Sequence, residues 1–193
     1  TELEKVPDTI VSRCQTFTFK KPTDAILTQV VKNVAEKEGY TLQEGGAELI
    51  ALLADGAFRD ALGTLQKIIS FSKDKKISKE EIESVTGAPS TTLVDEFLNA
   101  LADSDIERGY ACIMHASEQN IDMAVYLKMV LAKLRFALML RYAPKTKDSI
   151  AKTVSASDME FIEDLVSRKP EHISSSTLSI LLESYQSLRT SVI

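Results

Sequence analysis

The chain has 193 residues, of which 44% are hydrophobic and 26% charged, and its formal net charge is −5. These values are those of an ordinary soluble globular protein. Because the chain has no basic cluster, its sequence gives no sign of a positively charged surface that would bind nucleic acid or an anionic membrane. No apolar run is long enough to cross a bilayer and the N-terminus has no signal-peptide pattern, so we predict a cytoplasmic protein without membrane contact.

Cysteine and histidine are too scattered to predict a metal site. Cys14 and Cys112 have no CxxC spacing, and His115 and His172 are equally isolated. Structural zinc sites need closely spaced pairs of such ligands. We therefore expect no metal on this chain.

Residues 1–20 differ in pattern from the rest of the chain. Val6 to Val11 can form a short helical turn with a proline near its start. Beyond Ser12-Arg13-Cys14, Phe17 and Phe19 alternate with threonines, which is the period of a strand. A single strand cannot satisfy its own backbone, so it must pair with strands outside this chain. We interpret residues 1–20 as the C-terminal remnant of an upstream α/β domain.

Residues 21–88 have helical periodicity and predict a small domain of about four helices. The first helix runs from about Thr23 to Glu38 and is closed by a glycine. Thr41 and Glu44 have the spacing of a capping box for the second helix.

The third helix of this domain is predicted to follow Gly56, which can close the second helix in a left-handed conformation. Arg59 lies in the first turn of this third helix. Gly63 lies inside the helix and weakens it slightly unless a neighbouring residue packs against the glycine. The helix has an apolar stripe of Ala61, Leu62, Leu65, Ile68 and Ile69. Ser78 and Glu81 form a capping box for a short fourth helix.

Residues 89–193 predict a second, separate helical bundle. The helix from Met123 to Tyr142 has too broad an apolar face for a lone surface helix, so it should be the core of this bundle. We read the polar stretch from Pro144 to Ser155 as an exposed connection. The other four predicted helices are Leu93 to Ala102, Ile106 to Ser117, Ser157 to Arg168, and Ile173 to Val192.

Two of these helix starts carry a further capping-box pattern. Ser104 pairs with Glu107 at one start, and Ser157 pairs with Glu160 at the other. The pattern strengthens both predicted starts.

Arg59 is the first candidate functional residue. A guanidinium and the free N–H groups at a helix N-terminus both favour phosphate, so Arg59 can hold an anion. The alternative is a structural arginine on the surface, for instance one paired with Asp55.

Two motifs together resemble the clamp-loader subunits of the AAA+ ATPases, above all the gamma/tau family of bacterial DNA polymerase III. They are Val11-Ser12-Arg13-Cys14-Gln15 before the phenylalanine strand, and Gly56-Ala57-Phe58-Arg59-Asp60-Ala61-Leu62 one small domain later. The resemblance runs through the whole chain. It implies a mainly α fold, with the end of the ATPase domain in 1–20, the helical lid in 21–88 and the helical collar in 89–193.

The resemblance also implies a role for each arginine. Arg13 would be the arginine finger, reaching from one subunit to the γ-phosphate of ATP bound by its neighbour. Arg59 would be the sensor 2 residue, reaching the same phosphate from the lid of the subunit that binds the nucleotide. A permanently charged, forked donor suits both roles, because it stabilises charge on phosphoryl oxygens.

The sequence departs from the family pattern at two lid positions. Ala57 stands where the motif usually has serine. Gly63 stands where it usually has serine or alanine. The related delta-prime subunit shares Ser-Arg-Cys, but its lid generally lacks the Arg59-Asp60 pair, which favours gamma/tau.

The phosphate loop is missing, because none of the seven glycines precedes a lysine as G-x-x-x-x-G-K-[ST] requires. No strand ending in paired acids is present to hold magnesium. We therefore expect ATP and Mg to bind only the full-length protein, whereas this chain would be inactive alone and bind neither. The family's zinc module would also lie outside it.

The resemblance implies an ATPase subunit of a DNA-directed DNA polymerase holoenzyme, a nucleotidyltransferase, in which ATP binding and hydrolysis load a sliding clamp on primed DNA. The collar would contact gamma/tau, delta and delta-prime subunits through apolar faces of its helices 123–142 and 173–192. The same apolar residues can instead fill the bundle's own core. The clamp and DNA would be contacted by the missing ATPase domain.

Two alternatives remain. A RarA-like or RuvB-like AAA+ ATPase of replication or recombination would share the lid arginine but differ in its C-terminal region. A helical subunit-interaction module without a nucleotide role would leave Arg13 and Arg59 as surface residues.

Overall fold

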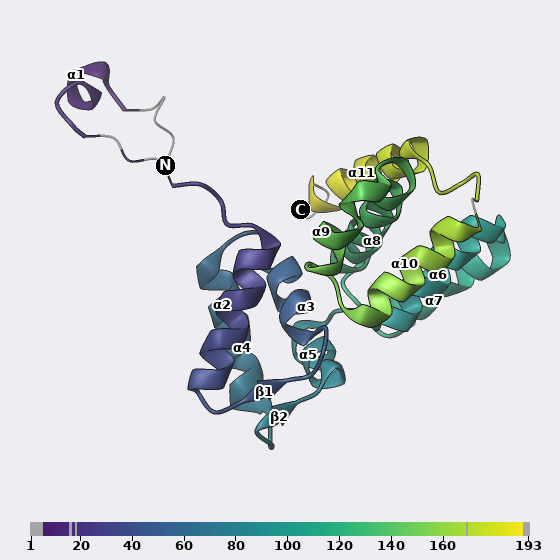
Figure 1. Cartoon of the computed structure of the whole chain (residues 1–193), viewed down its shortest axis with the longest axis horizontal. Coiled ribbons are helices and arrows are strands. Elements are labelled where there is room, and N and C mark those ends of the chain that lie inside the picture. The colour runs from purple at the N-terminus through teal and green to yellow at the C-terminus, as the bar shows by residue number, and fades with distance from the viewer. Residues whose placement is uncertain (1–5, 16, 18, 169, 191–193) are drawn as a thin grey trace.

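The computed structural model describes residues 6–15, 17, 19–168 and 170–190, and this part of the chain is almost entirely helical, as predicted. Two groups of helices lie side by side (Figure 1). The first helical group contains α2 (Asp24–Lys37), α3 (Gly46–Leu53), α4 (Phe58–Phe71) and α5 (Lys79–Thr86). The second helical group contains α6 (Thr91–Asp103), α7 (Ile106–Glu118), α8 (Met123–Tyr142), α9 (Lys147–Ala151), α10 (Ala156–Ser167) and α11 (Ser175–Thr190).

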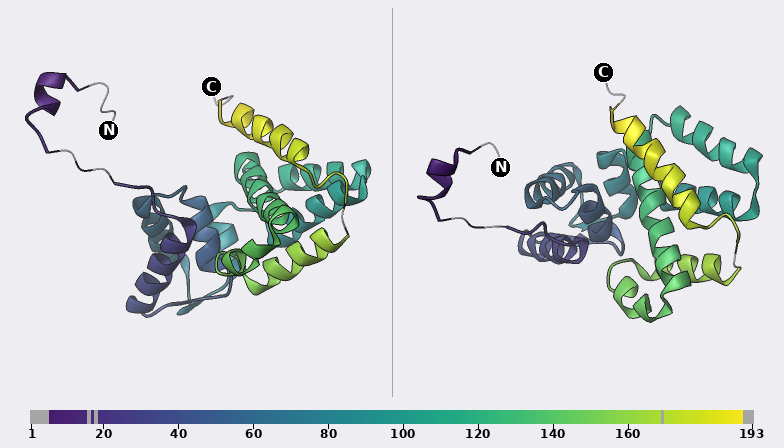
Figure 2. Two further views of the ribbon diagram at one scale, coloured as in Figure 1. Left: turned by 45° about the horizontal axis from the view of Figure 1, so that its top comes forward. Right: turned by 90° about the horizontal axis from the view of Figure 1, so that it is seen from above.

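The N-terminal segment lies apart from both groups. Its helix α1 (Asp8–Val11) confirms the predicted helical turn and stands away from the helical body (Figures 1 and 2). Phe17 and Phe19 are 70% and 92% exposed, and neither lies in a strand. The strand predicted there is not formed at these residues, and Thr16 and Thr18 lie outside the described part of the chain. An isolated strand lacks backbone partners, as the sequence implied.

The first helical group is built from amphipathic helices with local caps. Thr23 caps α2 by accepting a hydrogen bond from the backbone N of Ile26 at 3.4 Å. Ser78 and Glu81 form the predicted capping box of α5. Buried residues of all four helices then meet in its interior, among them Leu27, Val31, Ile50, Ala61, Leu65, Ile68 and Ile82.

A small parallel strand pair, which the sequence did not predict, crosses the end of this group. Strands β1 (Thr41–Leu42) and β2 (Lys76–Ile77) pair with Thr41 opposite Lys76. The predicted capping box of Thr41 and Glu44 is therefore wrong. The N-cap of α3 is Gly45 at φ 82°, and no side chain caps this helix. Thr41 instead belongs to the strand ladder.

The second helical group is organised around α8, as its broad apolar face predicted. Val130, Leu134 and Ala137 of this helix are fully buried. Helices α6, α7, α10 and α11 all contact it, so most of its circumference is covered. Helix α11 packs chiefly on α8 through Leu178 and Leu181.

Two predicted helix caps of this group are wrong. Ser104 ends α6 in a left-handed conformation at φ 60°, and the N-cap of α7 is Asp105, which accepts from the backbone N of Arg108 at 3.0 Å. The N-cap of α10 is Ser155 rather than Ser157. In each case the sequence offered two capping residues within two positions of each other.

The stretch from Pro144 to Ser155 is not simply an exposed connection. It forms a 3-10 turn (Pro144–Thr146) and α9, and it buries Ile150 at 1% exposure and Ser155 at 4%. Beyond α10, Arg141 from the end of α8 donates hydrogen bonds to the carbonyl oxygens of Pro170 at 2.8 Å and Ile173 at 2.9 Å. This arginine fixes the chain that leads into α11.

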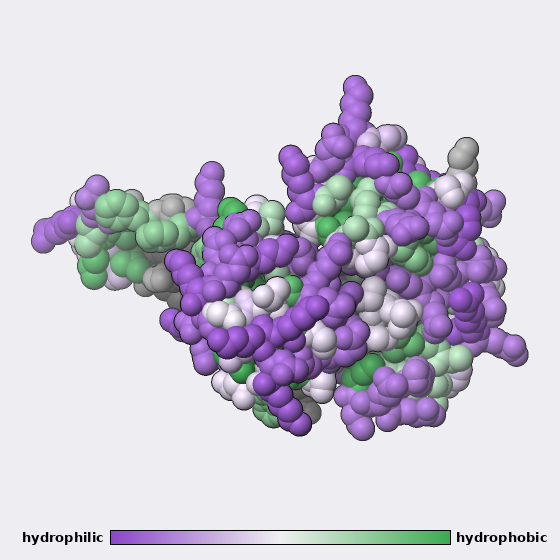
Figure 3. All heavy atoms as spheres, turned by 60° about the horizontal axis from the view of Figure 1, so that its bottom comes forward, coloured by the Kyte–Doolittle hydropathy of each residue, from purple (hydrophilic) through white to green (hydrophobic). Residues whose placement is uncertain are grey.

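In the described part of the chain, no helix is both long and apolar enough to cross a membrane. The face shown in Figure 3 is mainly hydrophilic, and its apolar residues form separate patches.

Two glycines at α4 should respond oppositely to substitution by alanine. A Cβ on Gly63 would meet nothing within 4 Å, so Gly63→Ala should stabilise the helix by about 0.5 to 1 kcal/mol. Gly56 has φ 76°, and a Cβ there would lie 2.1 Å from Cε of Lys21. Gly56→Ala should therefore destabilise the chain by roughly 1 to 2 kcal/mol.

Urea unfolding followed by circular dichroism measures both changes. A control variant, Gly56→Ala with Lys21→Ala, should recover only the steric part of the loss, because the left-handed backbone remains. Equal effects of the two glycine substitutions would contradict this account of the turn.

Candidate functional site

The turn between α3 and α4 presents Arg59. Asp55 and Gly56 both have left-handed backbones, at φ 53° and φ 76°, and reverse the chain after α3. Ala57 is the N-cap of α4 and makes no side-chain capping hydrogen bond. The first N–H groups of α4 therefore have no side-chain cap, which is the arrangement that favours an anion.

Arg59 is exposed in this first turn, on the face of α4 opposite its buried stripe. Among the described residues no ion pair involves Arg59, so the predicted alternative of a structural Arg59–Asp55 bridge finds no support. Asp55 lies instead 2.9 Å from Nζ of Lys128. The guanidinium of Arg59 is thus presented to solvent beside the start of the helix.

Lys21 brings a second cationic side chain to the same turn. Its methylene groups lie against the backbone of Gly56, since a Cβ added to that glycine would meet Cγ, Cδ and Cε of the lysine within 2.8 Å. Sequence reasoning missed Lys21 because it precedes the helices of the first helical group and contacts the turn only in the folded chain.

Arg13 lies elsewhere. It follows α1, where its backbone N donates to the carbonyl oxygen of Ile10 at 3.1 Å, and its side chain is exposed. Because α1 stands apart from the helical body, the structure does not bring Arg13 and Arg59 together (Figure 1).

A second polar cluster, which the sequence did not predict, lies inside the second helical group. Nζ of Lys133, on α8, lies 2.5 Å from Oδ1 of Asp95 and 2.6 Å from Oδ1 of Asp158. Both contacts are ion pairs, and the contact with Asp95 is also a hydrogen bond. Phe161 packs its ring 5.0 Å from the same ammonium. A buried ammonium with two carboxylates and an aromatic face is well compensated.

The two carboxylates of this cluster differ in pKa. Burial raises the pKa of Asp95, and the attraction of Lys133 offsets only part of that rise. Asp158 experiences the same burial, but Lys133 and a hydrogen bond from Ser155 outweigh it and lower the pKa of this carboxyl. The signal that sequence reasoning overlooked was a lysine within the apolar face of α8.

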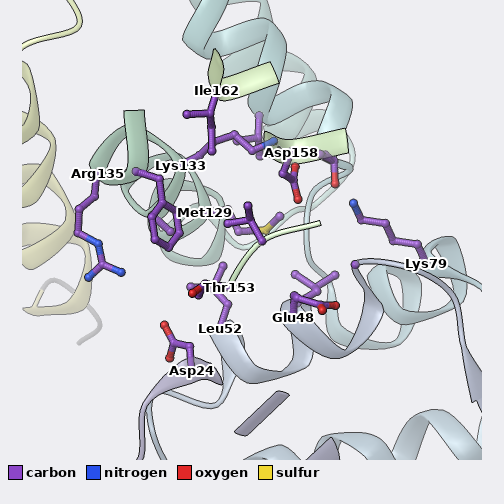
Figure 4. A pocket seen from close by; sticks show the side chains of 17 residues that line it. Asp24, Glu48, Leu52, Lys79, Met129, Lys133, Arg135, Thr153, Asp158 and Ile162 are labelled. Carbon is purple, nitrogen blue, oxygen red and sulfur yellow. Dashed lines mark ion pairs between the residues drawn. The ribbon is translucent and has the colours of Figure 1, made fainter. Parts of the chain in front are cut away.

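The Lys133 cluster borders a pocket of about 90 Å³ between the two helical groups (Figure 4). Side chains of both groups line it, including Leu52 and Lys79 from the first and Met129 and Asp158 from the second. Lys79 points across the pocket toward Asp158. Apolar and polar side chains line the pocket in about equal number, and no cluster of potential metal ligands was found in the described part of the chain. The pocket therefore marks the joint between the groups.

The chain is similar to two DNA polymerase subunits over most of its length. The tau subunit of DNA polymerase III from Bacillus subtilis (strain 168) is 29% identical over 189 residues, which are 98% of this chain and 33% of that protein. The gamma/tau subunit from Mycoplasma genitalium is 30% identical over 132 residues, which are 68% of this chain and 22% of that protein. The chain thus spans a third or less of these relatives.

Other comparisons add little. No family model matches the chain. Among solved structures, the DNA clamp loader delta protein of Bacillus subtilis covers 96% of this chain and 55% of its own, with 17% identity and a TM-score of 0.42. That TM-score is too low to support an argument.

The two sequence relatives define the class of protein as a subunit of bacterial DNA polymerase III. Within that class the chain belongs to the gamma/tau family of bacterial DNA polymerase III.

Asp158→Asn should destabilise the chain in a pH-dependent way. Because its pKa is lowered on folding, ionised Asp158 contributes stability above its unfolded pKa, and this contribution is lost as pH falls through the folded pKa. We expect a loss of roughly 1 to 3 kcal/mol at pH 7 that shrinks under acid conditions. Urea unfolding at neutral and acid pH measures it.

Asp95→Asn provides the matched control, because the pKa of Asp95 is shifted the other way. Because the pKa of Asp95 is raised on folding, the protonated form of this carboxyl contributes stability at low pH, and the contribution is lost as pH rises through the folded pKa. A loss at Asp158 that stays constant with pH would contradict the assignment.

Proposed function

We propose that the protein carrying this chain is an ATP-driven clamp loader in which Arg59 contacts the γ-phosphate of nucleotide bound by the same subunit. The observation that carries this proposal is the exposed Arg59 in the uncapped first turn of α4, without an ion pair among the described residues. Its guanidinium and the helix N–H groups point to one anion. Lys21 adds positive charge to the same turn.

The placement of Arg13 supports a role in trans. A finger that reaches a neighbouring subunit must be exposed, and Arg13 is exposed and follows α1, which stands apart from the helical body (Figure 1). In phosphoryl-transfer systems an arginine supplied in trans raises the rate by about 10³ to 10⁵. Hydrolysis would then depend on correct contact between subunits.

ATP and Mg would be held by an ATPase domain outside this chain. Of the catalytic groups, this chain would supply only the two arginines, which orient and stabilise the phosphoryl oxygens. ATP binding would open the sliding clamp through the assembled ring, and hydrolysis would release the clamp on primed DNA. In this proposal the first helical group is the lid and the second is the collar.

A mixture of variants tests the two arginine roles. In the full-length protein assembled with its loader partners, Arg13→Ala and Arg59→Ala should each lower ATP hydrolysis driven by clamp and primed DNA, by about 10³-fold where no intact site remains. An equal mixture should regain part of the activity, because some interfaces then contain both arginines. Steady-state phosphate release measures the rates.

Two outcomes would overturn this proposal. A mixture no better than the average of the two variants would contradict a shared site between subunits. No effect of either substitution would favour a helical interaction module, or another class of AAA+ protein, over the nucleotide roles.

We also propose that α11, rather than α8, meets the neighbouring subunits. The apolar residues predicted on α8 fill the core of its own group, whereas α11 exposes Ile180 at 63%, Leu182 at 42% and Leu188 at 39%. These three side chains lie on different sides of α11, so they leave apolar surface around the helix outside its packed stripe. The partners that contact α11 would be the gamma/tau, delta and delta-prime subunits.

Ile180→Glu should weaken assembly with the partner subunits by at least about tenfold while leaving the unfolding free energy nearly unchanged, because the side chain is already exposed. Analytical ultracentrifugation of the reconstituted complex measures the assembly. Ile106→Glu is the matched control, since Ile106 is 86% exposed on α7. Equal loss in both variants would remove the special role of α11.

A further inference from the structure

Two polar contacts between the helical groups hold opposite ends of α3. At its start, Oε1 of Glu44 accepts a hydrogen bond from the backbone N of Ala156 at 3.0 Å. At its end, Nζ of Lys128 lies 2.9 Å from Oδ1 of Asp55 and donates to the carbonyl oxygen of Leu53 at 3.4 Å. The helices of each group otherwise pack mainly on helices of the same group. These contacts therefore help to set how the groups sit against each other.

The Lys128 contact reaches the turn that presents Arg59. Leu53 is the last residue of α3, and Asp55 is the first of the two left-handed residues that reverse the chain. Only Gly56 and Ala57 separate Asp55 from the start of α4. A displacement of Asp55 must therefore move the first turn of α4.

Lys128 itself is carried by a rigid element. It lies on α8 next to the buried Met129, in the helix that forms the core of the second helical group. Its side chain is only 17% exposed, so water screens its charge less than that of a surface lysine. The side chain of Asp55 is 55% exposed, which leaves the pair free to break when the groups move.

We propose that Lys128 is a positioning residue for Arg59, coupling movement of the second helical group to the turn that presents the arginine. The coupling rests on the proposed role of Arg59 and deepens it. When α8 shifts relative to the first helical group, Lys128 pulls or releases Asp55, and the guanidinium of Arg59 moves with α4. A movement of the second helical group thereby changes the position of Arg59 relative to the nucleotide, and the side chain of Lys128 transmits this movement.

Steady-state kinetics of the full-length protein, assembled with its loader partners, tests this coupling. Lys128→Met should lower the kcat of hydrolysis stimulated by clamp and primed DNA by about three- to tenfold, with the KM for ATP within about twofold of the original. Lys128→Arg, which keeps the charge, should retain most of the rate. Glu44→Ala, which removes the acceptor of the Ala156 hydrogen bond, is the matched control and should leave the rate unchanged, because Glu44 joins the groups away from the Arg59 turn.

A double-mutant cycle identifies the partner of Lys128. Asp55→Asn removes the charge while keeping a residue that tolerates a left-handed backbone. If the lysine acts through Asp55, the variant with both Lys128→Met and Asp55→Asn should be no slower than the slower single variant.

The outcomes separate the coupling from the function on which it rests. If Arg59→Ala lowers the stimulated rate but Lys128→Met does not, or if Glu44→Ala is equally slow, the coupling is overturned and the role of Arg59 stands. Additive losses in the cycle would also overturn it. If Arg59→Ala has no effect, the nucleotide role falls and the coupling falls with it.

Discussion

The placement of the candidate arginine depends on one backbone constraint, the two consecutive left-handed residues between α3 and α4. Asp55 and Gly56 reverse the chain within a few residues, so that α4 starts with its first turn open and its apolar stripe facing the interior. An ordinary backbone at Gly56 would redirect α4, and Lys21 packs against the glycine where any side chain would collide. The same turn therefore fixes both the fold of the first helical group and the direction in which Arg59 points.

The second helical group depends on a different kind of interaction. The buried ammonium of Lys133 ties α8 to α6 through Asp95 and to α10 through Asp158, in a core that is otherwise apolar. Burying such a charge is favourable only when its partners are in place. The cluster thus specifies how three helices fit together, whereas apolar packing alone tolerates several arrangements.

Helix existence and order could be predicted because apolar spacing and glycine positions are local signals. The structure confirms the predicted left-handed backbone at Gly56 and the predicted capping box at Ser78 for that reason. The wrong caps at Ser104 and Ser157 reflect a choice between neighbouring capping residues, whereas the failure at Thr41 needed information from a distant residue. Thr41 was drawn into a strand by Lys76, thirty-five positions away in the printed sequence. The contacts of Lys128 and Lys133 lie between helices, and a single sequence without its fold gives no measure of such proximity. The motifs singled out Arg59, but its exposure and its uncapped helix could only be seen in the structure.

Helix α11 has a different energetic status from the rest of its group. It packs chiefly on α8, and its entry is held by the two hydrogen bonds that Arg141 donates. A segment with one buried face and an exposed opposite face opens locally at a lower free energy than a central helix. Opening α11 uncovers the apolar face of α8 against which Leu178 and Leu181 pack, so local unfolding at this end of the chain exposes a second apolar surface without loss of the remaining core.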